Sequence, residues 1–258
     1  MKAVILAGGL GSRLSEETIN KPKPMVEIGG KPILWHIMQI YSYYNIDEFI
    51  ICCGYKGYII KEFFDSYFPS NRDKQLQNNN LEYLINNKLN KSWKVTLSDT
   101  GETTMTGGRL KRVRNLLNNE KLFCFTYGDG VADINISKLV DFHKKHNKLA
   151  TLSACRPQAR YGALTFGQDD IVTSFVEKPE GDGSWINGGF FVLNPDVIEK
   201  IKDDQTSWEG SPLINLAKEN QLYAYKHHGF WMPMDTLRDK NELNKLWNND
   251  NAPWKKWE

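Results

Sequence analysis

The segment AVILAGGLGSRL at residues 3–14, with KPKP at residues 21–24, decides the fold that we expect. Its first part, Ala3–Ala7, is a short and wholly apolar run that ends in glycines. A run of this kind is typical of a parallel strand whose two faces are both buried. The sequence therefore begins with a strand that leads directly into a glycine-rich loop.

A helix and a second strand follow this loop. Pro32 can open the helix, because its fixed φ suits the first helical turn. Apolar side chains then recur at helical spacing, at Ile33, Ile37, Ile40, Tyr41 and Tyr44. Asn45 ends the helix, and the apolar run Phe49–Cys53 indicates the next strand. A strand, loop, helix and strand in this order predict the parallel α/β class.

The rest of the chain continues in the same manner. Strands are predicted at residues 94–97, 122–127, 149–154, 163–166, 171–176, 190–193 and 222–225, and helices at 136–146, 195–201 and 236–247. The segment at about 71–91 is rich in Asn and Lys, and we interpret it as a surface excursion or an oligomer contact. Because no repeat or linker is evident, we expect one domain over residues 1–258. It would hold a mixed, mainly parallel central sheet flanked by helices, with a C-terminal helix and tail at about 236–258.

Composition excludes several classes of partner. The 258 residues carry a formal net charge of +2, which gives no bulk attraction to nucleic acid or to an anionic membrane. No apolar run approaches the length of a membrane span, and Gly8 and Gly9 end the opening run too early for a signal peptide. The four cysteines have no zinc-site spacing and lie mostly in apolar runs, which favours free thiols and a cytoplasmic location.

The glycine-rich loop has the chemistry of a phosphate site. Three closely spaced glycines after a strand allow backbone N–H groups to face a phosphate without obstruction by Cβ. Arg13 and Lys23 add positive charge, and Pro22 and Pro24 restrict the chain around the lysine. The dinucleotide fingerprint would require glycine where Leu14 stands, and the Gly-Lys-Ser/Thr of a P-loop is absent from this segment.

Asp129 lies between two glycines at the end of the strand predicted at 122–127. Open parallel sheets bind ligands beyond the carboxyl ends of their strands. A carboxylate there suits Mg²⁺, which prefers hard oxygen ligands and bridges to phosphates. The alternative is that Gly-Asp-Gly is only a tight turn, and the phosphate loop upstream favours the metal ligand.

These motifs together resemble those of the sugar-1-phosphate nucleotidyltransferases, a Rossmann-like family with the signature G-G-x-G-[ST]-R-L followed by P-K-P. Within this family, the segment SEETINKPKPMVEIGGKPILWHI at residues 15–37 resembles the glucose-1-phosphate cytidylyltransferase branch more closely than the other branches. Further matches are DTG, TGGRLKRV, FTYGDGVAD, EKP, INGGFFVLNP and GFWMPMDTLRDK, so the resemblance covers the chain apart from the Asn-rich segment.

The resemblance implies roles for individual residues. Arg13, Lys23 and Asp129 would be catalytic, and Asp129 with Asp235 would bind Mg²⁺. The nucleotide would contact Leu6, Ala7, Gly8, Gly9, Leu10, Gly11, Ser12, Arg13, Lys23, Thr104, Arg109 and Gly128. The sugar phosphate would contact Tyr161, Gly162, Glu177, Lys178, Asn187 and Gly188. The substrates would be CTP and glucose 1-phosphate, joined by direct displacement at the α-phosphorus with release of pyrophosphate.

Other interpretations stay open from the sequence. The chain could use another nucleoside triphosphate or another sugar 1-phosphate, or be a non-catalytic nucleotide-binding module. Asp235 could instead cap the terminal helix, and Lys111 and Arg112 could form a solvated helix face. His36 lies in an apolar helix, where a packing role is expected. The tryptophans at 247, 254 and 257 could pack on the body or across the interface of a homo-oligomer.

Overall fold

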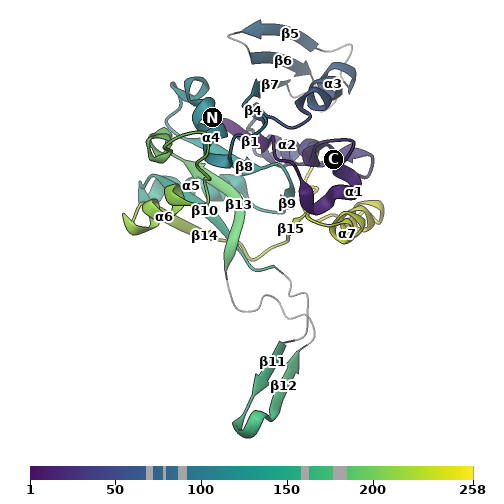
Figure 1. Ribbon diagram of the computed structural model, residues 1–258, viewed down its shortest axis with the longest axis vertical. Helices are drawn as coiled ribbons and strands as arrows, with labels where there is room; N and C mark the ends of the chain where they lie inside the picture. Colours follow the sequence, from purple (N-terminus) through teal and green to yellow (C-terminus); the bar gives the residue numbers. More distant parts are fainter. Residues whose placement is uncertain (68–71, 78–79, 87–91, 158–162, 177–184, 258) are drawn as a thin grey trace.

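A nine-stranded sheet organises the chain in this computed structural model, which describes residues 1–67, 72–77, 80–86, 92–157, 163–176 and 185–257 (Figure 1). Its strands, in spatial order, are β14 (Leu222–Lys226), β10 (Ala150–Cys155), β13 (Ile186–Leu193), β8 (Phe123–Tyr127), β1 (Lys2–Ala7), β4 (Glu48–Cys53), β7 (Ser92–Asp99), β6 (Asn80–Asn86) and β5 (Arg72–Gln77). Strands β13 and β6 run opposite to the others, so the sheet is mixed and mainly parallel, as predicted.

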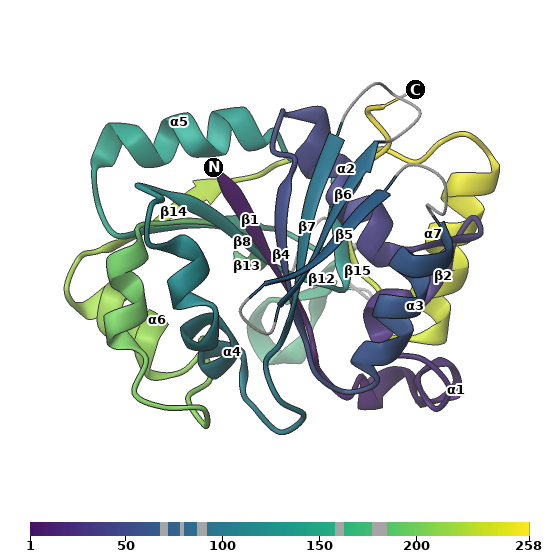
Figure 2. The ribbon, with the colours of Figure 1, turned by 90° about the horizontal axis from the view of Figure 1, so that it is seen from above.

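Helices lie on both faces of this sheet (Figure 2). They are α1 (Ser15–Thr18), α2 (Ile33–Tyr43), α3 (Gly57–Tyr67), α4 (Thr106–Arg112), α5 (Ile136–His146), α6 (Ser211–Lys218) and α7 (Leu237–Asn248). Short 3₁₀ helices occur at Ser12–Leu14, Lys23–Met25, Arg114–Leu117, Gln168–Asp170 and Pro195–Lys200. The last of these was expected to be an α-helix. Helices α3 and α6 are absent from the sequence-based prediction.

Strand β1 shows why its sequence is apolar throughout. It pairs in parallel with β4 on one side and with β8 on the other. Ala3, Ile5 and Ala7 pack into the core on the side of α2 and α5, whereas Val4 and Leu6 pack on the opposite side, near Leu110 and Val113. A strand covered on both faces has no solvent side, and so it carries no polar alternation.

The Asn-rich segment contributes strands to the main sheet rather than an excursion from it. Strands β5 and β6 form an antiparallel pair, and β6 adds antiparallel to β7. Tyr83 and Ile85 alternate into the core, and the Tyr83 hydroxyl donates to Asp65 of α3 at 3.1 Å. The alternating apolar positions are few and lie among many polar residues. For this reason the sequence pattern of the segment did not indicate a strand.

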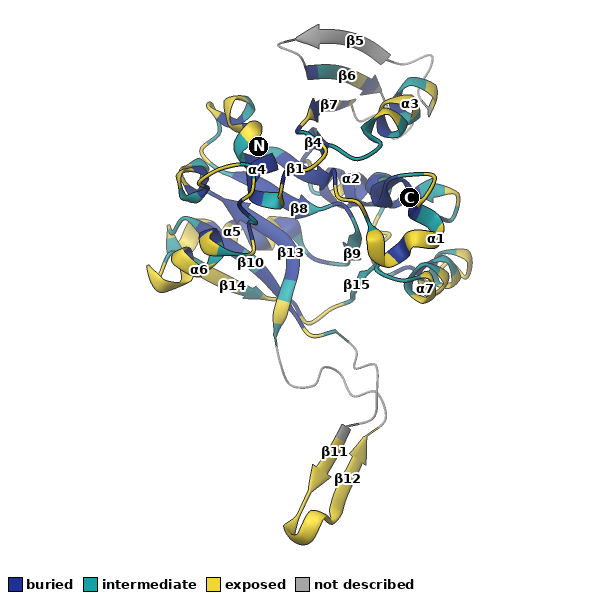
Figure 3. Ribbon diagram, in the orientation of Figure 1, coloured by how far each residue is buried: buried dark blue, intermediate teal, exposed yellow. Residues whose placement is uncertain are grey.

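Three small antiparallel pairs lie outside the main sheet in the described part of the chain. The predicted hairpin is confirmed as β11 (Ala163–Phe166) with β12 (Val172–Val176), which stands away from the sheet in Figure 1. Its residues 164–176 are exposed (Figure 3). A second pair, β9 (Gly130–Ala132) with β15 (Trp231–Pro233), was not predicted. A last pair is β2 (Glu27–Ile28) with β3 (Lys31–Pro32).

The C-terminal tryptophans pack on the body of the chain. Trp254 is fully buried, and its Nε1 donates to His36 Nδ1 at 3.4 Å. The His36 Nε2 lies 2.9 Å from the carbonyl oxygen of Ile28, so this histidine has the packing role expected of it. Trp247 stacks on Trp254 with ring centroids 6.4 Å apart. These tryptophans therefore give no support to the predicted homo-oligomer, which stays a prediction.

The four cysteines are free and buried, as expected. No helix in the described part of the chain is long and apolar enough to cross a membrane.

Candidate active site

Four strands end side by side where the candidate site lies. Strands β8, β1, β4 and β7 are neighbours and parallel, so their carboxyl ends meet at one edge of the sheet. The chain order reverses at β1, because β4 follows it on one side and β8 on the other. Ligands of open α/β sheets bind at such a switch point. Gly8, Gly54 and Gly128 each follow directly on one of these strands.

The phosphate loop has two kinds of glycine. Gly11 has φ +65°, and a Cβ there would meet Thr18 at 2.8 Å, so the turn itself requires glycine. Gly9 is exposed, and a Cβ added to it would have nothing within 4 Å, which leaves room for a ligand. Leu10 and Ser12 are exposed beside it, and Arg13 extends outward with 77% of its side chain accessible.

The Lys23 ammonium lies between two carboxylates. Its Nζ is 2.7 Å from Asp129 Oδ2 and 2.6 Å from Asp235 Oδ1, and Arg13 Nη1 donates to Asp235 Oδ2 at 2.9 Å. Burial acts to lower the pKa of Lys23, but the negative charge and hydrogen bonds of the two aspartates outweigh it and raise that pKa. The structure thus brings together, from distant parts of the chain, the four charged residues that the sequence singled out.

The unpredicted ribbon of β9 and β15 sets the distance between the two aspartates. Asp129 immediately precedes β9, and Asp235 follows β15 by one intervening residue. Met234 donates its N–H to the carbonyl oxygen of Asp129 at 2.8 Å, which continues the ladder to the site. Thr236, not Asp235, caps α7, in a capping box with Asp239. The Asp235 side chain is therefore free of the capping role and faces Lys23.

The two carboxylates fit a magnesium ion. Asp129 and Asp235 supply hard oxygen donors to one point, where the lysine ammonium now provides the positive charge. Among the described residues no third His, Cys, Asp or Glu joins them. Mg²⁺ commonly takes one or two protein carboxylates and completes its shell with water and substrate phosphates, so a pair is sufficient.

The buried Arg109 side chain binds the backbone of the glycine-rich phosphate loop. It is 4% exposed, and its guanidinium donates to the carbonyl oxygens of Gly8 at 2.9 Å and Gly101 at 2.7 Å, and to the Thr100 hydroxyl at 2.8 Å. Thr104 is buried close by, between β7 and α4. The predicted nucleotide contacts Thr104 and Arg109 thus lie below the phosphate loop, with the Arg109 guanidinium engaged by the backbone.

The solvated basic face expected of α4 is present in part: Arg112 is exposed and Lys111 half-buried, and both side chains are also hydrogen-bonded to the protein. Lys111 Nζ donates to the carbonyl oxygens of Ile201 and Lys202 at 2.8 and 2.7 Å. Arg112 forms two hydrogen bonds with Asp204, at 3.0 and 2.6 Å. Both side chains therefore tie α4 to the segment that precedes α6.

The predicted sugar side lies at the start of β13. Asn187 Nδ2 donates to the Tyr127 hydroxyl at 3.1 Å, and the carbonyl oxygen of Gly188 accepts from Trp231 Nε1 at 2.7 Å. Tyr127 ends β8, two residues before Asp129, so Asn187 is brought to the same edge as the aspartates. The other four predicted sugar contacts, Tyr161, Gly162, Glu177 and Lys178, lie outside the described residues.

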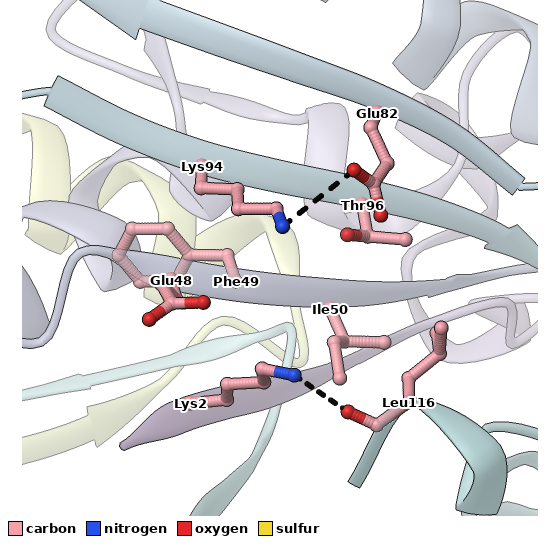
Figure 4. A pocket seen from close by; sticks show the side chains of 8 residues that line it. All are labelled: Lys2, Glu48, Phe49, Ile50, Glu82, Lys94, Thr96 and Leu116. Atoms are coloured by element: carbon pink, nitrogen blue, oxygen red, sulfur yellow. Dashed lines mark hydrogen bonds and ion pairs between the residues drawn. The ribbon is translucent and has the colours of Figure 1, made fainter. Parts of the chain in front are cut away.

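Sequence reasoning missed Tyr127, whose hydroxyl accepts from Asn187. It stands next to the Gly-Asp-Gly turn, which was the available signal. The pocket drawn in Figure 4 is a separate feature at the opposite ends of the strands, lined by Lys2, Glu48 and Lys94 among others. Its volume of about 30 Å³ is too small for a nucleotide.

Comparison with known proteins shows the family to which this chain belongs. The family model described as nucleotidyl transferase matches residues 2–249. Glucose-1-phosphate cytidylyltransferase of Salmonella typhi is 60% identical over 260 residues, covering 100% of both chains. A probable glucose-1-phosphate cytidylyltransferase of Bacillus subtilis (strain 168) is 44% identical over 258 residues, again covering 100% of both.

A solved structure shares the fold. HddC from Yersinia pseudotuberculosis superposes with a TM-score of 0.68 and 26% sequence identity, over 95% of this chain and 99% of that chain, and it has also been solved in complex with GMP-PN. With the family model over residues 2–249 and a full-length relative at 60% identity, this chain belongs to the nucleotidyl transferase family and, within it, to the glucose-1-phosphate cytidylyltransferases.

Proposed function

We propose that this enzyme transfers a cytidylyl group from CTP to glucose 1-phosphate, giving CDP-glucose and pyrophosphate. The observation that carries the proposal is the Lys23 ammonium held at 2.7 and 2.6 Å between Asp129 and Asp235, beside a glycine-rich loop. The choice of CTP and glucose 1-phosphate is supported by the 60% identical relative, whose name states that activity.

The reaction is a direct displacement. An oxygen of the sugar phosphate forms a bond to the α-phosphorus of CTP, and the bond from that phosphorus to the bridging oxygen breaks. Pyrophosphate leaves with the electron pair. The attacking phosphate is already ionised near neutral pH, so no protein nucleophile or base is required. The barrier arises mainly from the need to orient the two substrates and from repulsion between their negative charges. The protein therefore has to position both substrates and neutralise their charge.

Each charged residue has a part in that task. Arg13, exposed at the mouth of the site, is placed to bind the departing phosphates with its planar guanidinium. Lys23 supplies charge close to the reacting phosphorus. Asp129 and Asp235 would hold Mg²⁺, and the ion would neutralise charge on the α-phosphoryl group when bound. An ion held there would share with Lys23 the neutralisation of the two carboxylates, which the lysine alone provides in this structure.

A substrate panel tests the proposal. The purified chain is offered CTP, UTP, dTTP, GTP or ATP with glucose 1-phosphate and Mg²⁺, and pyrophosphate release is measured. We expect kcat/KM for CTP to exceed that for each other nucleotide by about 100-fold or more, as discrimination by specific hydrogen bonds permits. Equal or better turnover of another nucleotide would refute the assignment of CTP. Mannose 1-phosphate in place of glucose 1-phosphate tests the sugar in the same assay.

A further inference from the structure

A histidine and a carboxylate meet at the end of the β9–β15 ribbon that lies away from the two site aspartates. His227 Nε2 is 3.0 Å from Asp133 Oδ1 and 3.0 Å from the carbonyl oxygen of Phe230. Both neighbours are acceptors, so this nitrogen carries a proton in either charge state of the ring. Asp133 Oδ1 is closed off from solvent and accepts a hydrogen bond from no other group among the described residues. The buried His227 therefore compensates this carboxylate oxygen.

A glycine lets the chain pass close to this pair. A Cβ on Gly229 would lie 2.2 Å from Asp133 Oδ1 and 2.8 Å from His227 Cε1. Any larger residue at position 229 would have to push the carboxylate or the imidazole aside. Gly229 itself is exposed, so its replacement acts on the pair from the surface of the molecule.

Backbone hydrogen bonds connect the pair to the site. Asp133 donates its N–H to the carbonyl oxygen of Phe230 at 3.1 Å, which extends the ladder of β9 and β15 beyond Ala132. The opposite end of the same ladder is the hydrogen bond from Met234 to Asp129. Each strand of the ribbon has only three residues, and an isolated pair of such short strands is not stable in water. The spacing within the ribbon therefore depends on what holds its ends.

His227 joins the ribbon to the main sheet. Its backbone N–H donates to the carbonyl oxygen of Ala154 at 2.8 Å, in strand β10, which lies between β13 and β14. The imidazole therefore extends from a fixed point and holds Asp133 in place. Without the imidazole a carboxylate oxygen would stay buried and unpaired, a cost that is relieved when Asp133 moves toward water. Such a movement displaces β9 and, with it, Asp129.

We infer that His227 and Asp133 are positioning residues, which set the spacing of Asp129 and Asp235 for a divalent metal ion from the far end of the ribbon. This inference rests on the proposed function, in which the two aspartates hold the ion. A site whose ligands are already arranged binds more tightly, because the observed Kd rises by the inverse of the fraction of molecules in the arranged state. The affinity for the metal is therefore the property that the pair controls.

Three substitutions and a control test this role. His227→Leu removes the donor, Gly229→Ala displaces the carboxylate, and His227→Gln keeps an N–H donor near the position of Nε2. His228→Leu is the matched control, because His228 is the exposed neighbour and its ring lies against Trp185.

The first measurement is metal binding without turnover. Mn²⁺, which also binds carboxylates, is titrated into each full-length protein, and the free ion is followed by its electron paramagnetic resonance signal. The binding that is lost in Asp129→Ala belongs to the site. Thermal unfolding shows whether each fold is retained. Pyrophosphate release then gives the Mg²⁺ concentration for half-maximal activity and kcat at saturating Mg²⁺.

His227→Leu and Gly229→Ala should each raise the Kd for Mn²⁺ about tenfold, the lower end of what residues behind metal ligands contribute. The Mg²⁺ concentration for half-maximal activity should rise in parallel, while kcat at saturating Mg²⁺ stays within about threefold, because Arg13 and Lys23 are unchanged. His227→Gln should raise the Kd by about threefold or less, and His228→Leu should match the wild type. A purely structural role would lower the unfolding temperature and leave the Kd for Mn²⁺ of the folded protein unchanged.

An unchanged Kd for Mn²⁺ in Gly229→Ala and in His227→Leu would overturn the inference and leave the proposed function intact. An equal rise in His228→Leu would also overturn it. If His227→Leu does not fold, Gly229→Ala decides the question, because it keeps both members of the pair and only displaces them. A wild-type protein that binds no more Mn²⁺ than Asp129→Ala would overturn the proposed metal site, and the inference with it.

Discussion

Arg109 donates a hydrogen bond from Nη2 to the carbonyl oxygen of Gly8 over 2.9 Å, across 101 residues of sequence. The guanidinium also donates to the carbonyl oxygens of Gly101 and Glu102, at 2.7 and 3.2 Å. It is a buried cation satisfied by backbone carbonyls from the ends of several strands rather than by a carboxylate. Its planar fork of donors suits this task, because one group reaches several fixed acceptors at once.

Arg109→Lys should destabilise the fold. A lysine cannot span the same acceptors, and the buried carbonyls left unpaired should lower the free energy of unfolding by about 2–3 kcal/mol. Urea unfolding measures this. Arg114→Lys is the matched control, since Arg114 is exposed and pairs with Glu199 on the surface, where an ion pair is worth about 0–1 kcal/mol. Equal effects of the two substitutions would show that the backbone contacts of Arg109 do not stabilise the loop.

Gly8 and Gly9 should respond in opposite ways to alanine. A Cβ on Gly8 would lie 2.1 Å from Arg109 Nη1, and the guanidinium cannot move without losing its acceptors, so Gly8→Ala should cost about 1–3 kcal/mol of stability. A Cβ on Gly9 would have nothing within 4 Å, so Gly9→Ala should keep its stability within about 0.5 kcal/mol. We expect Gly9→Ala to raise KM for CTP instead, because the methyl group occupies the space open to a phosphate. Wild-type KM in Gly9→Ala would remove Gly9 from the nucleotide site.

Lys23→Ala should lower kcat by about 10²–10³, as the loss of a charge clamp in phosphoryl transfer does. Pyrophosphate release from CTP and glucose 1-phosphate is the measurement, with circular dichroism to confirm the fold. Lys21→Ala controls for the shared Lys-Pro-Lys-Pro segment, because Lys21 faces Glu27 at 3.5 Å and not the aspartates. Full activity in Lys23→Ala would refute the site.

Asp129→Asn and Asp235→Asn should each raise the Mg²⁺ concentration needed for half-maximal activity by more than about tenfold, because an amide is a weaker ligand for a hard cation. Removing Mg²⁺ with a chelator should abolish turnover, and added Mg²⁺ should restore it. Asp196→Asn, at an exposed carboxylate far along the chain from both aspartates, serves as the control. Activity that survives the chelator would exclude a metal from the reaction.

Stability should fall as the pH is lowered from about 6.5 to about 4, in part because of His36. Burial lowers the pKa of this fully enclosed histidine from 6.5 to about 4. Over this pH range the unfolded chain therefore binds a proton that the folded chain does not bind. This lowers the free energy of unfolding by on the order of 3 kcal/mol at pH 4. Burial likewise lowers the pKa of His143 to about 4, so it adds to the same slope. Urea unfolding at several pH values should show a shallower dependence in His36→Gln than in the wild type; identical slopes would contradict this account.

Much of the fold was predictable because its signals are local. The apolar run of β1 and the helical spacing after Pro32 each depend on neighbours in sequence, and both elements occur where expected. Strand β6 and the ribbon of β9 and β15 were missed. Each has few apolar positions and is stabilised by pairing with another strand, which a local sequence pattern does not show.

The sequence by itself determined a phosphate loop after a buried strand, and it singled out the charges of Arg13, Lys23, Asp129 and Asp235. Glycine spacing, residue type and family resemblance are properties of the sequence, and they can be recognised without knowledge of the structure. Only the tertiary structure decided that the Lys23 ammonium lies between both carboxylates, because Asp129 and Asp235 are each far from Lys23 in sequence and meet through the ladder of β9 and β15. It alone also placed Asn187 beside Tyr127, since the start of β13 and the end of β8 are 60 residues apart in sequence and meet only where the two strands pair.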